Sequence, residues 1–291
     1  MNEGFAAGQA EWRARLGTLR QVVRQELVAR QLADQLPDLP PRRVLDVGCG
    51  QGTQALQLAR RGHAVTGLDA SAQLLDDCRA ALAKEPVEVR ARVRLVRGDA
   101  ERLVEAFGPA SHDVVLCQGV LMYFPDPGPL MDAVGQVLAP GGFASLLVRN
   151  GDALAMRPGL LADWDAVEGA FEGHAYRNRL GVDARADRLA DLTAALARRG
   201  MAVRQWYGVR VFTDHAASDA PLPDAETLDA ILRHEERAGR TDPYRRVAAL
   251  LHVIAERPQE QSPHPAAAGA DVQGSSGVRR TTRDTKPNAP R

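Results

Sequence analysis

The sequence has few cysteines and no long apolar run. Only 3 of its 291 residues are cysteine, and neither a C-x-x-C pair nor a cysteine–histidine cluster occurs, so we expect no disulfide framework and no metal site. No window approaches the ~18 apolar residues of a membrane span, and the first residues lack the apolar core of a signal peptide. These absences favour a cytoplasmic protein in a reducing compartment, with no membrane partner.

A net charge of either sign is also lacking. The 37 Lys and Arg residues balance the 37 Asp and Glu residues, so the overall charge gives no reason to expect binding to nucleic acid or to a membrane surface. A local excess of positive charge remains at residues 177–210, which contain eight arginines and three aspartates. This segment is a candidate phosphate-contacting stripe, although a solvated helix face would explain several of its arginines.

The stretch that carries most information is V-L-D-V-G-C-G-Q-G at residues 44–52. Its apolar half suits a strand buried on both faces, as in a parallel sheet covered by helices. The glycines that follow allow positive φ and let backbone N–H groups approach a ligand with no side chain between. Residues 53–60 have apolar positions at helical spacing, so we expect a helix that Thr53 caps and whose positive end faces the loop.

The spacing of this loop helps to separate two ligand classes. Dinucleotide sites prefer G-x-G-x-x-G, whereas this chain has D-x-G-x-G-x-G with Asp46 still on the strand. A carboxylate there suits the ammonium group of S-adenosylmethionine (SAM) and would repel a pyrophosphate. We therefore predict that Asp46 and the loop around Gly48 and Gly50 hold SAM. A glycine-rich turn that binds no ligand is the alternative.

Two further strand ends offer polar groups to a nucleoside. Residues 63–69 predict a second strand that ends at Asp69, where a carboxylate can accept both ribose hydroxyls in a doubly wound fold. Residues 93–96 predict a third strand, after which Asp99 or the backbone of Ala100 would read the adenine amine. A solvated strand end and simple turn chemistry are the corresponding alternatives.

A fourth strand is predicted at residues 113–120, and it ends at the crevice where open α/β sheets bind ligands. Gln118, Met122 and Tyr123 should therefore line the site. Gln118 as a polar residue at the edge of the core is the alternative.

The alternation of strands and helices predicts an α/β fold. We expect a Rossmann-like doubly wound, mostly parallel seven-stranded sheet with an antiparallel hairpin at its edge. The motif L-A-P-G-G-F should turn into a strand at residues 144–149, residues 201–211 should form the hairpin, and residues 244–256 should give a helix followed by a short edge strand.

Several distant segments share one further pattern. Besides the 44–52 loop they are G-T-L-R-Q at 17–21, R-G-H-A-V-T-G-L-D-A-S-A-Q at 61–73, the strand leading to Val120 and Leu121, G-V-R-V-F at 208–212, D-P-Y-R-R at 242–246 and L-H-V at 251–253. Together they resemble the bacterial tRNA methyltransferases that esterify 5-carboxymethoxyuridine at the anticodon wobble position, a family of class I SAM-dependent methyltransferases. The resemblance covers about residues 12–257.

This resemblance implies SAM as the cofactor, S-adenosylhomocysteine as the product, no metal, and the tRNA anticodon loop as the partner. It implies SAM contacts from Arg20, Gly48, Cys49, Asp69, Ala100 and Gln118. The chain departs from the family, which tends to have His where Gln118 stands and an acid and Trp where Met122 and Tyr123 stand. A lysine-rich run of the family is replaced here by residues 176–179. A small-molecule carboxylate therefore stays open as the acceptor.

Hydrophobic periodicity and composition along the chain also suggest how it is divided. We predict an N-terminal helical cap at residues 1–40, a class I methyltransferase domain at 41–257 with a helical lid insertion at about 151–180, and a disordered tail at 258–291. In the lid, Trp164 and Tyr176 are candidates to stack on a substrate base. In the cap, Arg20 could point a guanidinium at a bound carboxylate.

Methyl transfer from a sulfonium is an in-line displacement, so the enzyme must align the nucleophile and exclude water. A carboxylate nucleophile is already ionised at neutral pH, and we therefore predict no catalytic base. Gln118 and Tyr123 are expected to orient the acceptor, and Arg20 or Arg210 to hold its carboxylate or a neighbouring phosphate. The competing hypotheses are a methyltransferase for a small metabolite and a SAM- or nucleotide-binding protein without turnover.

Overall fold

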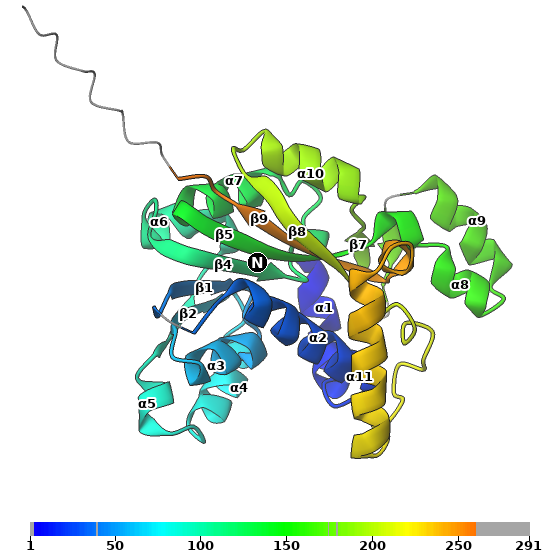
Figure 1. The fold of residues 1–291 in the computed structure, drawn as a ribbon, viewed down its shortest axis with the longest axis horizontal. Coiled ribbons are helices and arrows are strands. Elements are labelled where there is room, and N and C mark those ends of the chain that lie inside the picture. Colours follow the sequence, from blue (N-terminus) through cyan, green and yellow to red (C-terminus); the bar gives the residue numbers. More distant parts are fainter. Residues whose placement is uncertain (1–2, 39, 174, 179, 260–291) are drawn as a thin grey trace, which may run out of the picture. The chain divides into compact units, whose positions relative to one another are not determined.

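The computed structural model describes residues 3–38, 40–173, 175–178 and 180–259 (Figure 1). The tail predicted at 258–291 therefore lies outside the described residues from 260 onward. Among the described helices, none has the length and apolar character needed to cross a membrane.

A seven-stranded sheet forms the centre of the described chain, in the order β3-β2-β1-β4-β5-β9-β8. Its neighbours from β3 to β5 pair in parallel, while β9 runs antiparallel to both β5 and β8. The order reverses direction at β1 and β4, as in a doubly wound Rossmann-like fold, and confirms the predicted fold class. The strands are β1 Arg43–Val47, β2 Ala64–Asp69, β3 Val93–Arg97, β4 His112–Gln118, β5 Leu138–Arg149, β8 Ala202–Val209 and β9 Leu250–Glu256.

Helices cover both faces of this sheet (Figure 1). On one face α2 Leu19–Gln35, α3 Thr53–Arg60 and α11 Ala225–Arg240 pack their apolar side chains on the strands. On the other face α6 Leu103–Phe107, α7 Gly128–Val137 and α10 Leu189–Ala197 do the same. The remaining helices are α1 Glu3–Ala14, α4 Ala72–Leu82, α5 Val87–Arg90, α8 Met156–Leu160 and α9 Trp164–Glu172, with short 3-10 turns at η1 Ala100–Arg102, η2 Leu121–Tyr123, η3 Gly151–Ala153 and η4 Tyr244–Val247.

Several local predictions need correction at the helices. The N-terminal segment forms two helices rather than one, because the chain breaks at residues 15–17 and α2 begins after Thr18 in extended conformation. The cap of α3 is Gly52 at φ 79°, with no side-chain hydrogen bond, rather than the Thr53 hydroxyl. Ser71, by contrast, caps α4 by accepting a hydrogen bond from the N–H of Leu74.

The strands near the sheet edge also differ in detail. The two antiparallel partners, β8 and β9, are separated in sequence by α11, so they form no tight hairpin, and β9 lies inside the sheet while β8 is the edge. The uninterrupted burial of Leu250–Ala255 suits an interior strand covered on both faces. L-A-P-G-G-F is part of β5, because a bulge opposite His112 and Val114 lets the strand continue through the two glycines.

The insertion predicted as a helical lid is only partly helical. It contains α8 and α9 and then turns into a two-stranded antiparallel sheet of β6 Ala175–Arg177 and β7 Asp183–Arg185. Trp164 is 68% exposed, whereas Tyr176 lines the cavity described below. The predicted domain boundaries stay predictions.

Candidate functional site

A cavity of about 730 Å³ lies at the carboxyl ends of the parallel strands. Its wall comes from the glycine loop, the ends of β2 to β5, helices α1 and α2, and the insertion after β5. The structure brings most of the predicted site residues to this wall: Arg20, Gly48, Gly50, Asp69, Asp99, Ala100, Gln118, Tyr123 and Arg210. Asp46 and Cys49 line a small hollow of about 70 Å³ that shares Gly48 and Gly50 with the cavity.

The glycine loop is held by its own backbone bonds. The N–H groups of Gly48 and Cys49 donate to Leu68 O over 2.8 and 3.0 Å, and the N–H of Gly50 donates to Asp69 Oδ2 over 2.9 Å. The expectation that these N–H groups approach a ligand is therefore wrong. Because these three donors are used inside the fold, they are not available to a phosphate, and the loop favours a ligand with an ammonium group over a dinucleotide. Positive φ angles of 68° at Gly48 and 55° at Gly50 make the turn possible.

Asp69 is fixed in one orientation at the end of β2. Its second carboxylate oxygen accepts a hydrogen bond from the N–H of Ser71 over 2.8 Å, and the side chain is buried. Burial raises the pKa of Asp69, and the backbone N–H groups of Ser71 and Gly50 oppose that rise. The remaining lone pairs of a carboxylate held in this way can accept two ribose hydroxyls.

Asp46 is buried beneath the loop. Burial, together with the nearby Asp69 carboxylate, raises the pKa of Asp46 to about 7. A cation placed beside Asp46 would favour its ionised form. Burial likewise raises the pKa of the Cys49 thiol, which therefore stays protonated and is no nucleophile.

Asp99 caps the turn that follows β3. Its side chain accepts a hydrogen bond from the N–H of Glu101 over 3.1 Å, at the start of η1. Asp99 therefore stabilises the turn, which was the alternative prediction for this residue. Asp99 and Ala100 also lie on the cavity wall.

Gln118 ends a buried chain of hydrogen bonds that sequence reasoning missed. Its Nε2 donates to Ser145 Oγ over 3.0 Å, Ser145 Oγ lies 2.8 Å from His252 Nε2, and His252 Nδ1 lies 2.7 Å from Gln31 Oε1. Burial lowers the pKa of His252 to about 3, so the ring is neutral. Since a carbonyl oxygen only accepts, Nδ1 donates to Gln31 and Nε2 accepts the Ser145 hydroxyl.

Tyr123 faces the cavity from η2. Burial raises the pKa of Tyr123 to about 12, and Asn178 Nδ2 donates to its hydroxyl over 3.5 Å. A phenol with that pKa stays protonated at neutral pH and can donate a hydrogen bond to an acceptor, but it is no base.

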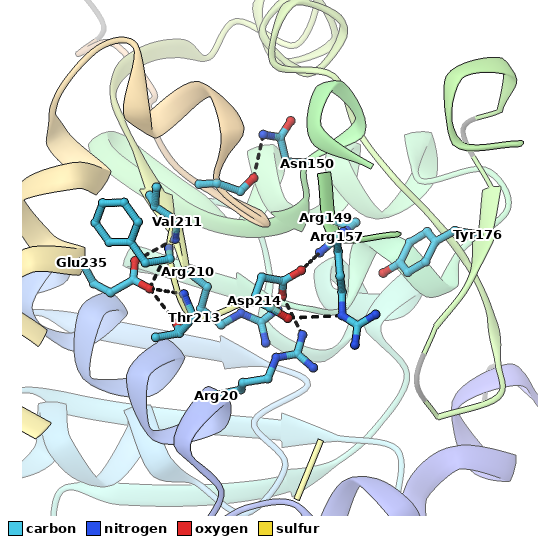
Figure 2. Close-up of polar contacts among 12 residues, drawn as sticks. Arg20, Arg149, Asn150, Arg157, Tyr176, Arg210, Val211, Thr213, Asp214 and Glu235 are labelled. Carbon is cyan, nitrogen blue, oxygen red and sulfur yellow. Dashed lines mark hydrogen bonds and ion pairs between the residues drawn. The ribbon is translucent and has the colours of Figure 1, made fainter. Parts of the chain in front are cut away.

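Arg20 and Arg210 meet around one carboxylate, that of Asp214 (Figure 2). Arg20 Nη2 lies 2.6 Å and Arg210 Nη2 3.3 Å from Asp214 Oδ1, and Arg149 Nη1 lies 3.3 Å from Oδ2. Arg157 Nε donates to the backbone oxygen of Asp214 over 3.2 Å. Burial lowers the pKa of Arg210, and Arg149 adds to that effect while Asp214 opposes it. The four guanidinium groups line the cavity.

Glu235 of α11 holds the segment that carries this cluster (Figure 2). Its carboxylate accepts hydrogen bonds from the N–H groups of Val211, Phe212 and Thr213 over 2.7 to 3.0 Å, and from the Thr213 hydroxyl over 2.6 Å. Arg210, just before these residues, has φ 62°, which is costly for a residue with a side chain. The clamp explains why that conformation persists.

The basic stripe predicted at residues 177–210 is largely neutralised by ion pairs. Arg179 lies outside the described residues. The stripe's ion pairs include Arg185 with Asp187, Arg188 with Asp152, Arg199 with Asp132 and Arg204 with Glu256. The segment is therefore no row of unpaired cations.

Other residues at the cavity also escaped prediction. Trp12 of α1 packs against Gly50, and Arg24 donates to the carbonyl oxygen of Gln118 over 3.2 Å. Arg149 had a usable signal, because it ends a parallel strand at the ligand-binding edge of the sheet. No local pattern marks Asp214 or Arg157. Within the described ranges, no three His, Cys, Asp or Glu side chains are grouped to hold a metal ion.

Comparison with known proteins places these features in context. Residues 45–146 match the family model described as a methyltransferase domain. The chain is 31% identical over 252 residues to the tRNA 5-carboxymethoxyuridine methyltransferase of Escherichia coli (strain K12), covering 84% of this chain and 92% of that protein. A ubiquinone biosynthesis O-methyltransferase of Paracidovorax citrulli is 37% identical over 126 residues, which cover 42% of this chain and 51% of that protein.

Solved structures share the fold at lower identity. The magnesium protoporphyrin IX methyltransferase of Synechocystis with bound S-adenosylhomocysteine superposes with a TM-score of 0.56 and 19% identity. That match covers 86% of this chain and 94% of the other. It supports the fold and carries no substrate information.

Proposed function

Since this chain belongs to the tRNA 5-carboxymethoxyuridine methyltransferase family of class I SAM-dependent methyltransferases, we propose that it methylates a carboxylate on a modified wobble uridine of tRNA. The observation that carries this proposal is a single cavity that joins the glycine loop to a buried cluster of arginines. A cationic methyl donor and an anionic acceptor would meet in such a cavity.

The donor end fits SAM by its chemistry. When bound, SAM supplies an electrophilic methyl group on a sulfonium. Asp69 would accept hydrogen bonds from the ribose, Asp46 would face the ammonium group, and Asp99 and Ala100 would border the adenine. The glycine positions keep this wall free of side chains, which a ligand in close contact requires.

The acceptor end needs no general base. A carboxylate is ionised at neutral pH, and Tyr123 with a pKa of about 12 supplies a donor instead. We propose that Gln118 and Tyr123 orient the acceptor and that Arg210 balances its charge. The walls from α1, α2 and the insertion would exclude water from the reacting atoms.

A second candidate is a methyltransferase for a small-molecule carboxylate. The neutralised stripe at residues 177–210 and the formal net charge of +0 favour it, because tRNA binding rests largely on unpaired Lys and Arg. The arginine cluster would serve either acceptor.

The decisive experiment uses the purified chain, SAM and tRNA from cells that lack the methyl ester. Nucleoside mass spectrometry should detect the methyl ester of 5-carboxymethoxyuridine, and the Asp69→Ala variant should form far less of it. Unchanged tRNA, together with methylation of small carboxylates by the same preparation, would replace the tRNA proposal with the second candidate.

A further inference from the structure

The arginine cluster differs from an ordinary buried ion pair in its balance of charge. Arg20, Arg149 and Arg210 all contact the one carboxylate of Asp214, and Arg157 contacts its backbone oxygen. We propose that Arg149, Arg157 and Arg210 form the subsite that binds the carboxylate of the methyl acceptor. This inference rests on the proposed function and adds the residues that recognise the acceptor.

The positive charge of the cluster exceeds the negative charge that Asp214 supplies, which favours an anionic ligand. Among the described residues, the buried Nε atoms of Arg20, Arg149 and Arg210 have no hydrogen-bond partner. The three residues are at most 9% exposed, so water does not replace the missing partner at low cost. A carboxylate or phosphate in the cavity would not reach these Nε atoms, but it would add the missing negative charge and accept from the guanidinium N–H groups on the cavity wall.

The arginines and Asp214 differ in their position relative to the cavity. The four arginines line the cavity, whereas Asp214 is not part of its lining. Asp214 lies among the labelled arginines and pairs with Arg20 and Arg149, which holds their side chains in place (Figure 2). Asp214 neutralises only part of their charge, and an incoming monoanion would meet a net positive site.

The subsite is rigid enough to select a ligand. Glu235 fixes the backbone from Val211 to Thr213, and the Arg149 guanidinium lies 5.6 Å from the centre of the Tyr176 ring. Arg20 and Arg210 share one oxygen of Asp214, so an arginine assigned to the donor and one assigned to the acceptor use a common counter-charge. Groups held in this way lose little entropy when an anion binds.

The test measures binding to the full-length chain loaded with S-adenosylhomocysteine. Two nucleosides and one nucleotide serve as calorimetric probes: 5-carboxymethoxyuridine, the matching carboxamide without the charge, and uridine 5′-monophosphate. We expect the carboxylate to bind and the carboxamide to fail. Arg149→Gln and Arg157→Gln should each weaken carboxylate binding by about thirtyfold.

Two controls keep fold and site apart. Arg233→Gln removes an exposed arginine that pairs with Asp229 on α11, and it should bind the carboxylate like the wild type. Arg157 is only half-buried, so its loss should leave the fold intact. Both cluster variants should bind S-adenosylhomocysteine within about twofold of the wild type, which also shows that they fold.

The outcomes separate this inference from the proposed function. Equal binding of carboxylate and carboxamide, a preference for uridine 5′-monophosphate, or unchanged binding in both cluster variants would overturn the subsite. Arginine-dependent binding of the carboxylate nucleoside, with no methylation of tRNA, would support the subsite and refute the tRNA proposal. Methylation of tRNA at wild-type rates by both cluster variants would support the tRNA proposal and refute the subsite.

Discussion

The two ends of the cavity are built in different ways. At the glycine-loop end, polar groups satisfy one another, as the N–H groups of Gly48 and Gly50 do with Leu68 and Asp69. At the arginine end, Arg20 reaches Asp214 across 194 positions of sequence, and three buried Nε atoms lack a partner among the described residues. The glycine-loop end is ordered by hydrogen bonds of its backbone, and the arginine end is ordered by ion pairs to the carboxylate of Asp214.

This difference separates two kinds of specificity. A binding site built from backbone groups and fixed carboxylates can bind the same cofactor whatever the acceptor is. A cluster of guanidinium groups selects by charge and is assembled from side chains that can vary without disturbing the sheet. Apart from Arg20, which shares Asp214 with Arg210, we therefore expect changes at one end to leave ligand binding at the other largely intact.

Removal of Glu235 should break the arginine end most severely. The side chain is 1% exposed, and its carboxylate accepts the N–H groups of Val211, Phe212 and Thr213. Glu235→Ala would leave these donors buried without partners, so the free energy of unfolding should fall by ~3–5 kcal/mol. Urea denaturation followed by circular dichroism measures the change.

A matched control lies on the same helix. Glu226 is exposed in the first turn of α11, and Glu226→Ala should change the free energy of unfolding by at most ~0.5 kcal/mol. If Glu235→Ala proved as stable as this control, the clamp would not hold the cluster.

Asp69→Ala attacks the other end. The variant loses a charged acceptor that Gly50 and Ser71 hold in place, and SAM binding should weaken by ~1.5–3 kcal/mol. Calorimetry with S-adenosylhomocysteine measures the loss, and Asp76→Ala on the exposed face of α4 is the control. An affinity equal to that of the control would remove Asp69 from the cofactor site.

The glycine-loop end of the cavity could be predicted from the sequence more fully than the arginine end. The places of the glycine loop at residues 44–52 and of the strand-end acids Asp69 and Asp99 could be predicted. Contiguous residues and sheet geometry determine where these groups lie. The meeting of Arg149 and Arg157 at Asp214 was not predictable, because it depends on how the insertion and the end of β8 pack.

The same reasoning explains two errors within the fold. The apolar run of β9 was predicted at the edge, although such a run fits an interior strand. The loop N–H groups were predicted to face a ligand, because glycine spacing alone does not reveal that Leu68 and Asp69 already accept them. Partners that lie on another strand are invisible to a local motif.

The raised pKa of Asp46 gives the donor end a pH dependence. With a pKa of about 7 the carboxyl is protonated at lower pH, while the ammonium of SAM favours the ionised form. Affinity for S-adenosylhomocysteine should therefore fall as the pH drops below about 7, by up to about tenfold per pH unit. Asp46→Asn should bind more weakly at about pH 7 and show a flat profile between about pH 5 and pH 7.

The sign of the stability effect follows from the same shift. The unfolded chain releases the Asp46 proton near pH ~4, whereas the folded chain without ligand retains it up to about 7. The destabilising contribution of Asp46 thus grows as the pH rises across this window, and Asp46→Asn should remove it. A steep affinity profile that survived in Asp46→Asn would assign the titration to another group.

The smallest effect is expected at Gln118, on the wall that both ends share. Ser145→Ala removes the hydroxyl that links Gln118 to His252, and it leaves the buried Nε2 of a neutral ring without its donor. The free energy of unfolding should fall by ~0.5–1.5 kcal/mol, with S-adenosylhomocysteine affinity unchanged, because the cofactor end keeps its own bonds. Thr193→Ala, which removes a hydroxyl that donates to the backbone oxygen of Leu189 within α10, is the control. A Ser145→Ala variant that lost cofactor affinity as strongly as Asp69→Ala would mean that the two ends are not built independently.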